Sequence, residues 1–372
     1  MKVLILSASI GAGHTQAAEA IAEELGIRNV ELGISEKNQI EVLDFMDKKF
    51  SILNWLLKKL YLSMLGLIPD LYDRIYRLAG VRRFGSITRL IWSTLMYLPL
   101  SKLQKKLNPD VIICTHPFPE AAASLWKFLH PNNSKKFTLA AVLTDYSLHE
   151  IWIYEGVDIY FVATEEMKRE LESHGNFKVF ATGIPIRSQF QKLIAKDFQI
   201  ENSELRITHS ALIMGGGLGL GAFEDTIKSL EEVHFNLKII VVTGKNKSLQ
   251  SKLETLKSKH ELVVLGFVDN ISELMQQADI LISKPGALTL SEAFAVGLPI
   301  ILLPPIPGPE ALNAEYASTH GAALSLSKSV EIANAINIVN DKKQLQRMQQ
   351  SAKNLARPNA AAEIVDDIMY NI

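Results

Sequence analysis

The sequence predicts an α/β protein with two doubly wound, Rossmann-like domains that face a cleft. Its 372 residues exceed the usual size of one domain, and 48% hydrophobic against 21% charged residues is a globular composition. Short apolar runs alternate with helix-like segments through both halves, and each half opens on a strand followed by a glycine-rich loop. This alternation is typical of right-handed βαβ units, whose helices cover both faces of a parallel sheet.

The expected strands are apolar along their whole length, as strands buried on both faces are. In the first half they are Val3–Ser7, Gln39–Phe45, Val111–Thr115, Leu139–Thr144, Ile159–Thr164 and Val179–Thr182. In the second half they are Ala211–Met214, Lys238–Thr243, Leu262–Gly266, Ile280–Ser283 and Pro299–Leu303.

The domain boundaries follow from the same pattern. Residues 184–206 combine a proline with mixed charges and polar residues, which indicates a linker. We therefore expect an N-terminal domain over residues 1–187 and a C-terminal domain over residues 205–345. A C-terminal helix over residues 346–372 is expected to pack back toward the first domain.

A basic and apolar segment interrupts the first half. Between Lys48 and Lys106 the chain has twelve Lys and Arg against two acids, so this segment carries +10 while the whole chain carries −1. The segment also contains Trp55, Leu56 and Trp92 among many leucines. Such a mixture suits an interfacial helix on an anionic membrane surface, and it equally suits two amphipathic helices packed on a core. Nucleic acid is not an expected partner, because these aromatic residues lie among aliphatic runs rather than in a polar, basic stripe.

Several other classes are excluded by what the sequence lacks. The single cysteine, Cys114, rules out an internal disulfide framework and a multi-cysteine zinc site, and a reducing compartment fits. No run of 18 residues is apolar and uncharged, and the first apolar run is too short for a signal peptide. The histidines lack metal-ligand spacing and no D-x-D motif occurs, so we expect no metal ion in the site.

Two glycine loops are candidates for phosphate binding. The first runs from Gly11 to His14 and the second from Gly215 to Gly221, and each precedes a helix-like segment. Glycine lets the backbone approach a ligand closely, and free N–H groups at a helix start favour anions. Neither loop fits G-x-G-x-x-G, because Gln16 and Leu220 stand where the last glycine is required, so a nicotinamide dehydrogenase is disfavoured.

Polar residues also follow the strands of the second half. The run Ser283–Ala287 lies at the carboxyl end of a strand, where open α/β sheets bind ligands. Glu292, in the first turn of the next helix, could accept two ribose hydroxyls, or Thr289 and Glu292 could form a capping box. Glu310 and Asn313 could hold sugar hydroxyls, although an acidic residue such as Glu310 also suits the start of a helix.

In the first half, Asp145 follows a strand. This carboxylate could act as a general base or orient His14 or His149, and it could also cap a helix. Cys114 and His116 lie close together but lack an acidic partner in the sequence, so we expect them to pack at the end of a strand.

In their joint order these motifs resemble the diacylglycerol glycosyltransferases, which include processive bacterial glucosyltransferases and plant monogalactosyldiacylglycerol synthases. The lipid II-forming N-acetylglucosaminyltransferase is a more distant relative. The resemblance covers the chain from Leu4 to about Tyr316. It rests on Gly11–His14, Thr144-Asp145 with His149 and Trp152, Gly215–Gly221, Ser283–Ala293 and Pro307–Asn313.

The resemblance implies a GT-B glycosyltransferase that binds its acceptor on the first domain and a UDP-sugar on the second. Such an enzyme inverts the anomeric centre and needs neither metal nor cofactor. UDP-glucose or UDP-galactose would be the donor and diacylglycerol or a related lipid the acceptor. The basic segment would hold the protein on an anionic membrane, at its cytoplasmic face.

The resemblance also implies roles for individual residues. His14 would lie near the reacting centre, with Asp145 as the alternative base. The acceptor side would include Gly11, Gly13, His149 and Trp152. The donor side would be formed by Gly216, Gly217, Leu218, Gly219, Phe267, Ser283, Lys284, Pro285, Gly286, Ala287, Thr289, Glu292, Gly308, Glu310 and Asn313.

One departure leaves the donor sugar open. The chain has Gly308-Pro309-Glu310 where the family usually has Gly-Gln-Glu, so one sugar-contacting amide is missing. The alternatives to a transferase are a UDP-sugar 2-epimerase of the same fold and a non-catalytic UDP-sugar-binding protein.

Overall fold

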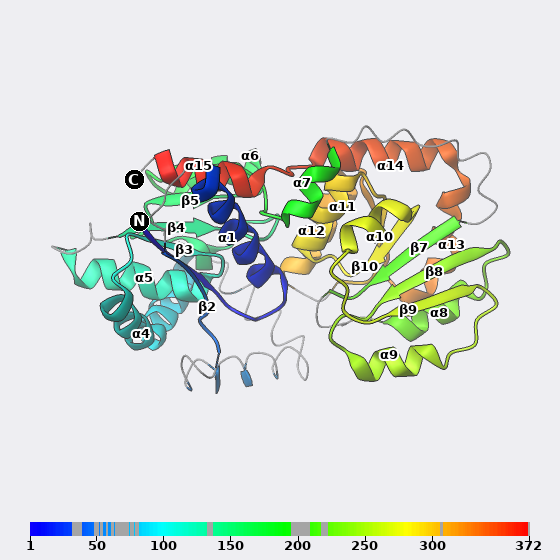
Figure 1. Cartoon of the computed structure of the whole chain (residues 1–372), viewed down its shortest axis with the longest axis horizontal. Helices are drawn as coiled ribbons and strands as arrows, with labels where there is room; N and C mark the ends of the chain where they lie inside the picture. Colours follow the sequence, from blue (N-terminus) through cyan, green and yellow to red (C-terminus); the bar gives the residue numbers. More distant parts are fainter. Residues whose placement is uncertain are drawn as a thin grey trace. The chain divides into compact units, whose positions relative to one another are not determined.

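The structure is a computed structural model of the chain, and its described part forms two compact units (Figure 1). It describes residues 1–31, 39–47, 82–131, 137–194, 209–216, 222–305 and 308–370, and single positions between 52 and 78. Unit 1 comprises mainly Met1–Ser188 and Asn359–Ile372. Unit 2 comprises Gln189–Ile306 and Glu310–Pro358.

Unit 1 contains a parallel six-stranded sheet with the order β2-β1-β3-β4-β5-β6. Its strands are β1 (Lys2–Ser7), β2 (Gln39–Asp44), β3 (Val111–Cys114), β4 (Thr138–Val142), β5 (Ile159–Phe161) and β6 (Val179–Phe180). All six were predicted, although β2, β3, β4, β5 and β6 end earlier than expected. Thr115 and Thr144 therefore lie in loops beyond the carboxyl edge of the sheet.

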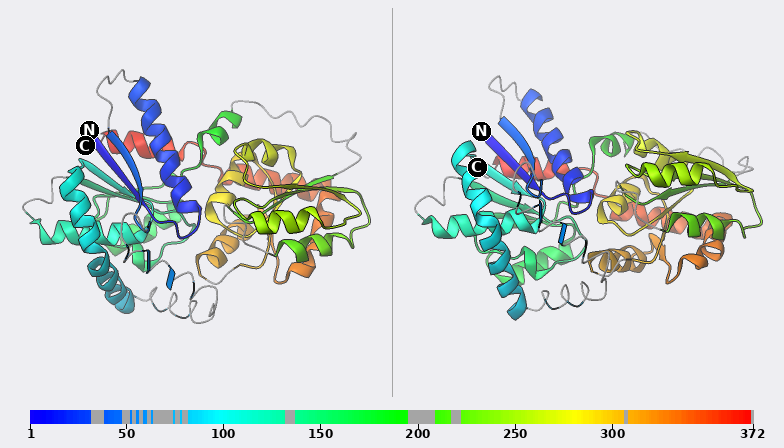
Figure 2. Two further views of the ribbon diagram at one scale, coloured as in Figure 1. Left: turned by 60° about the horizontal axis from the view of Figure 1, so that its bottom comes forward. Right: turned by 90° about the horizontal axis from the view of Figure 1, so that it is seen from below.

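Helices cover this sheet on both faces. They are α1 (Gly13–Glu31), α4 (Arg82–Leu107), α5 (Pro117–Leu129), the 3₁₀ turn η2 (Glu150–Trp152), α6 (Glu165–His174) and α15 (Ala360–Tyr370). The apolar sides of α1 and α15 share one core cluster with β1, β3, β4 and β5, and the two helices lie side by side (Figures 1 and 2). On the other face, α4 packs along α5 (Figure 2).

Unit 2 repeats this design with the strand order β12-β11-β10-β7-β8-β9, again all parallel. Its strands are β7 (His209–Met214), β8 (Leu237–Val242), β9 (Glu261–Leu265), β10 (Ile280–Ser283), β11 (Ile300–Leu302) and β12 (Ala323–Ser325). Its longer helices are α8 (Phe223–Leu230), α9 (Lys247–Glu254), α11 (Ala287–Val296), α12 (Pro309–Thr319) and α14 (Lys342–Leu355). Shorter ones are α10 (Ile271–Gln277), α13 (Ile332–Ala335), η4 (Ser329–Glu331) and η5 (Ile336–Asn340). The three-residue β12 was not predicted.

Two expectations about connections differ in part from the structure, although the units divide at Ser188/Gln189, inside the predicted linker. The predicted single helix over residues 346–372 is two helices: α14 packs on α11 in unit 2, and α15 packs on α1 in unit 1. The break contains Pro358, which disfavours helix in the residue before it. The predicted linker contains a helix, α7 (Ser188–Ile194), and residues 195–206 of that linker lie outside the described residues.

In both sheets the chain begins in the interior and winds outward in two directions. The winding reverses between β1 and β3 in unit 1 and between β7 and β10 in unit 2. At such a switch point, the loops beyond the carboxyl ends of the two strands leave the sheet in opposite directions and open a ligand-binding crevice. The loops after these four strands are therefore the places where the fold favours a site.

Candidate functional site

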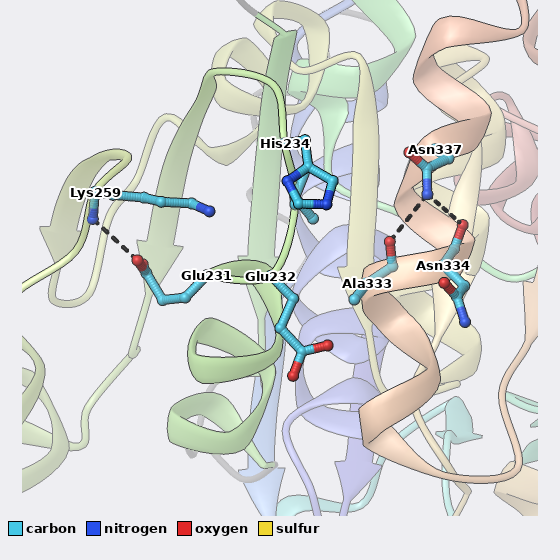
Figure 3. Close-up of a pocket in the computed structure, with 8 residues that line it drawn as sticks. Glu231, Glu232, His234, Lys259, Ala333, Asn334 and Asn337 are labelled. Atoms are coloured by element: carbon cyan, nitrogen blue, oxygen red, sulfur yellow. Dashed lines mark hydrogen bonds between the residues drawn. The ribbon is translucent and has the colours of Figure 1, made fainter.

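One cavity lies away from both switch points. It measures about 520 Å³ and opens near the amino-terminal ends of β8 and β9 in unit 2 (Figure 3). Its lining is polar and comes from Glu231, Glu232, Val233, His234, Lys259, Ala333, Asn334 and Asn337. No residue predicted for the site lines this cavity.

At the switch point of unit 1, His14 is held by three elements. It is the second residue of α1, and its Nδ1 lies 2.9 Å from the carbonyl oxygen of Thr115, beyond β3, and 2.6 Å from Oγ1 of Thr144, beyond β4. The Thr115 hydroxyl in turn donates to the His14 carbonyl oxygen at 2.9 Å. Because a carbonyl oxygen can only accept, we assign the proton to Nδ1, which makes Nε2 the basic nitrogen of the neutral ring.

The surroundings of His14 favour the neutral ring. Burial lowers the pKa of His14, and the negative charge of Asp145 and the Thr115 carbonyl offset part of this effect. The ring of His116 stands nearly perpendicular to that of His14, with centroids 4.6 Å apart. Burial, with His14 nearby, holds the pKa of His116 well below its ordinary value. The charge of Asp145 thus acts on the His14 ring, and the choice of base between these two residues stays a prediction.

Two neighbouring residues have structural roles instead. His116 caps α5, because its Nδ1 accepts from the Phe118 backbone N–H at 3.2 Å. His149 caps η2, where its Nδ1 accepts from the Ile151 N–H at 3.2 Å. The helical turn that follows Asp145 is therefore capped by His149 rather than by Asp145, so the interpretation of Asp145 as that cap is wrong.

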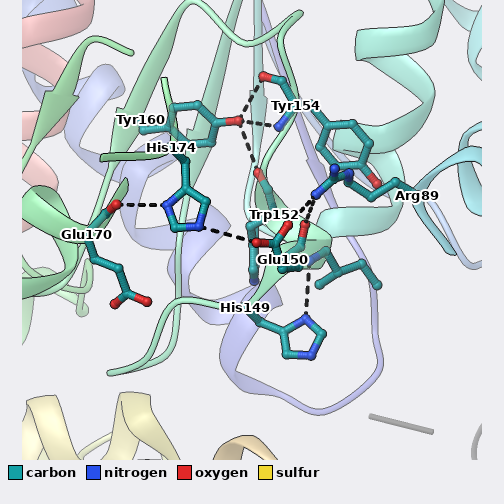
Figure 4. A network of polar contacts seen from close by, with 9 residues as sticks. Arg89, His149, Glu150, Trp152, Tyr154, Tyr160, Glu170 and His174 are labelled. Atoms are coloured by element: carbon teal, nitrogen blue, oxygen red, sulfur yellow. Dashed lines mark hydrogen bonds and ion pairs between the residues drawn. The ribbon is translucent and has the colours of Figure 1, made fainter. Parts of the chain in front are cut away.

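A partly buried polar network fixes the turn that carries His149 and Trp152 (Figure 4). Arg89 of α4 donates from Nη1 to the carbonyl oxygen and to the carboxylate of Glu150, both at 2.8 Å. Nε2 of His174, at the end of α6, lies 3.3 Å from the other carboxylate oxygen of Glu150. The Tyr160 hydroxyl lies 3.0 Å from the carbonyl oxygen of Trp152.

This network positions the turn that carries His149 and Trp152 from the side of α4. The sequence did not predict it. Its members come from segments far apart in the chain, so no local motif marks Arg89, Glu150 or His174. A small cavity of about 180 Å³ borders the network and is lined by Leu148, His149, Glu150, Ile153, Glu170 and His174. The Trp152 side chain itself is buried.

At the switch point of unit 2, β7 and β10 end beside each other. The Ser283 hydroxyl donates to the Met214 carbonyl oxygen at 3.0 Å and ties the two strand ends together. Gly216 has a φ of +68°, which a residue with a side chain adopts only with strain, and a Cβ there would lie 3.6 Å from Cε of Lys284. The Lys284 ammonium forms an ion pair with Glu310, in the first turn of α12.

The position of Glu292 differs from the expected one. The helix α11 begins at Ala287 and takes Gly286 as its N-cap, so Thr289 is its third residue and Glu292 its sixth. The capping box is therefore wrong, and Glu292 belongs to the second turn rather than the first. Glu292 is 2% exposed, in a helix that is buried along most of its length.

The remaining donor-side residues are only partly gathered at this edge. The buried Asn313 amide lies 3.4 Å from the Pro285 carbonyl oxygen, so α12 reaches the loop after β10. Phe267 follows β9 and is exposed, with the Lys245 ammonium 5.7 Å from its ring. Gly217, Leu218 and Gly219 lie outside the described residues.

Two further observations concern metal ions and membranes. Within the described ranges, no cluster of three or more His, Cys, Asp or Glu is arranged to hold a metal ion. Among the same residues, no helix combines the length and the apolar character that crossing a bilayer requires.

Solved structures share this architecture. MurG of Acinetobacter baumannii aligns with a TM-score of 0.61 over 100% of both chains at 16% identity. The calicheamicin glycosyltransferase CalG4 gives 0.61 at 12% identity over 100% of this chain and 98% of its own. A UDP-N-acetylglucosamine 2-epimerase gives 0.57 at 13% identity over 100% of this chain and 96% of its own. The fold is thus GT-B, as predicted, and it is shared by transferases and epimerases.

Sequence comparison then separates these classes. Residues 14–186 match the family model of monogalactosyldiacylglycerol synthase, and residues 210–368 match the glycosyltransferase family 28 C-terminal domain. The processive diacylglycerol beta-glucosyltransferase of Bacillus licheniformis is 34% identical over 99% of this chain and 94% of its own length. That of Bacillus subtilis is 32% identical with the same coverage. The chain belongs to the diacylglycerol glycosyltransferase family, and it is a glycosyltransferase.

The environment of His14 can be tested without substrate. We expect NMR titration of the imidazole to give a pKa below that of free histidine, because burial disfavours the imidazolium. Asp145→Asn should lower the pKa further, since it removes the charge that favours the protonated ring. Asp366→Asn, on the exposed surface of α15, is the matched control and should leave it unchanged. A higher pKa in Asp145→Asn would contradict the arrangement.

Proposed function

We propose that this glycosyltransferase moves a hexose from a UDP-sugar to a membrane lipid, with inversion and without a metal ion. Diacylglycerol is the proposed acceptor and glucose the first choice of sugar, because the similar Bacillus proteins are named diacylglycerol beta-glucosyltransferases. UDP-galactose stays the alternative donor. The observation that carries the proposal is the His14 ring at the switch point of unit 1, held so that Nε2 is its basic nitrogen.

In the proposed reaction, His14 Nε2 takes the proton of the acceptor hydroxyl as its oxygen attacks the anomeric carbon. The bond from that carbon to the UDP oxygen breaks, and attack from the opposite face inverts the centre. Asp145 stabilises the imidazolium that forms, or acts as the base itself. The loop amides at Gly216, the Lys284 ammonium and the start of α11 supply positive charge for the departing diphosphate.

The alternatives explain fewer of these features. A 2-epimerase of this fold transfers nothing to an acceptor and has no use for a basic, apolar surface. A UDP-sugar sensor would bind the nucleotide without needing His14 and Asp145 near each other. Family membership and this pair of side chains together favour transfer.

The nucleotide side of the proposal predicts a role for Glu292. If this carboxylate holds the ribose hydroxyls, Glu292→Gln should weaken UDP binding by about 1.5–3 kcal/mol through loss of a charge-assisted hydrogen bond. Glutamine has nearly the same shape, so the thermal unfolding temperature should change little. Isothermal titration with UDP measures the effect, and Glu273→Gln on α10 is the matched control. Unchanged UDP affinity in Glu292→Gln would overturn the ribose assignment.

A lipid acceptor requires the protein to reach a membrane, and α4 offers a surface for this. One side of α4 is buried and includes Ser93, Met96 and Leu100. Its opposite side exposes the apolar residues Ile87, Leu90, Ile91, Leu95 and Leu98. Trp92 does not belong to that exposed side, because its ring stacks on Phe118 at 4.2 Å.

One side of α4 packs on the core, as the core-packing reading of the basic segment expects, and the apolar stripe on the other side supports the proposed membrane contact. Ile52, Leu56 and Leu60, at helical spacing earlier in the segment, are exposed as well. Most of residues 48–81 lies outside the described residues. We propose that this surface holds the protein on the anionic, cytoplasmic face of the membrane.

Vesicle co-sedimentation tests the membrane surface. Binding should be stronger to anionic than to neutral vesicles and should fall with salt, leaving an apolar remainder. Replacing Lys58, Lys59, Arg82 and Arg83 by Gln should lower binding to anionic vesicles at least tenfold, since each charge contributes about 1 kcal/mol. The same number of Lys→Gln changes in unit 2, at Lys247, Lys252, Lys257 and Lys259, is the control. Equal binding to both vesicle types, or to neither, would contradict the proposal.

A further inference from the structure

The ion pair between Lys284 and Glu310 occupies the edge where the donor is proposed to bind. Lys284 is the first residue after β10, and Glu310 is the second residue of α12. Their side chains are 25% and 18% exposed, so both are largely shielded from solvent. The pair joins the loop after β10 to the helix α12, which follows the neighbouring strand β11.

Lys284 also lies beside groups that suit a diphosphate. A Cβ placed on Gly216 would lie 3.6 Å from Cε of Lys284. The aliphatic part of the lysine side chain therefore runs past the backbone of the glycine loop. Three residues after Lys284, α11 begins, and the Gly286 N-cap has no side chain that could satisfy its first N–H groups. A lysine, a glycine turn and a helix start together favour bound phosphate oxygens.

Glu310 is the carboxylate that this turn can offer to a sugar. The preceding Pro309 begins α12 and carries no side-chain donor or acceptor. In the structure the Lys284 ammonium donates a hydrogen bond to the Glu310 carboxylate. A sugar hydroxyl that approached it would have to compete with a full positive charge.

We propose that the diphosphate of the donor and the Glu310 carboxylate compete for Lys284, so that diphosphate binding releases Glu310 to accept sugar hydroxyls. This inference rests on the proposed UDP-sugar donor. A diphosphate carries more negative charge than one carboxylate and therefore draws the ammonium away from it. The exchange makes the sugar contact depend on the nucleotide, so that free hexose is not bound and a sugar nucleotide is.

A mutant cycle with UDP as the probe tests this exchange. Glu310→Gln should bind UDP on the order of tenfold more tightly than wild type, because Lys284 no longer has a competing charged partner. Lys284→Gln should bind UDP about tenfold more weakly. In the Lys284→Gln background, Glu310→Gln should have no further effect, since the competition no longer exists.

The cycle separates the exchange from simple charge repulsion. If Glu310 merely repels the diphosphate, Glu310→Gln tightens UDP binding equally with and without Lys284, and the exchange is overturned. Glu261→Gln, which removes the partner of Lys238 at the opposite edge of the sheet, makes the same charge change and should leave UDP affinity unchanged. Lys284→Arg keeps the positive charge, so Glu310→Gln should still tighten UDP binding in this background. This variant is the control for misfolding of the Lys284→Gln protein.

A second measurement tests the proposed contact between the Glu310 carboxylate and the sugar hydroxyls. The ratio of UDP-glucose to UDP affinity should fall in Glu310→Gln, because the released carboxylate is absent. Failure of wild type to bind UDP would overturn the proposed donor, and the exchange with it. Binding of UDP by wild type with no gain in Glu310→Gln would overturn the exchange alone.

Discussion

The reversal of winding inside each parallel sheet is the constraint on which the sites depend. At the β1/β3 and β7/β10 junctions, the two neighbouring strands are followed by helices on opposite faces of the sheet. The loops after the carboxyl ends of these strands therefore diverge. The first junction holds His14 through the Thr115 carbonyl and the Thr144 hydroxyl. The second gathers Gly216, Lys284 and Glu310. One topological feature, used twice, thus places a basic nitrogen in unit 1 and a cationic group in unit 2.

The helix α4 connects the proposed membrane surface with the loop that carries His149. Its outer side exposes an apolar stripe, while its inner side sends Arg89 to the carboxylate and carbonyl of Glu150. Nearby, burial raises the pKa of Glu120 well above its ordinary value despite the charge of Arg89. If α4 shifted on a bilayer, the contact between Arg89 and Glu150 would therefore transmit the shift to η2. Charged contacts are strong in a poorly solvated place such as this one.

Strand positions were readable from the sequence because buried parallel strands are continuous apolar runs. The ends of the strands were harder to predict, because Thr115 and Thr144 continue the apolar runs in the sequence. In the structure both residues lie beyond the strands and form hydrogen bonds with His14. The start of α11 was misplaced because a glycine N-cap leaves no side-chain signal, whereas Thr289 and Glu292 imitate one. Arg89, Glu150 and His174 meet only in the folded chain, so their network could not be predicted from local spacing.

Product analysis tests the central claim most directly. Purified protein in EDTA-containing buffer is given UDP-glucose or UDP-galactose and diacylglycerol in anionic vesicles, and the lipids are identified by mass spectrometry and the anomer by NMR. We expect a β-linked hexosyl-diacylglycerol from wild type. Turnover should fall roughly 10²–10⁴-fold in His14→Ala and in Asp145→Ala, with UDP binding retained. A product confined to the sugar nucleotide, no lipid product, or activity that requires added magnesium or manganese would contradict the account.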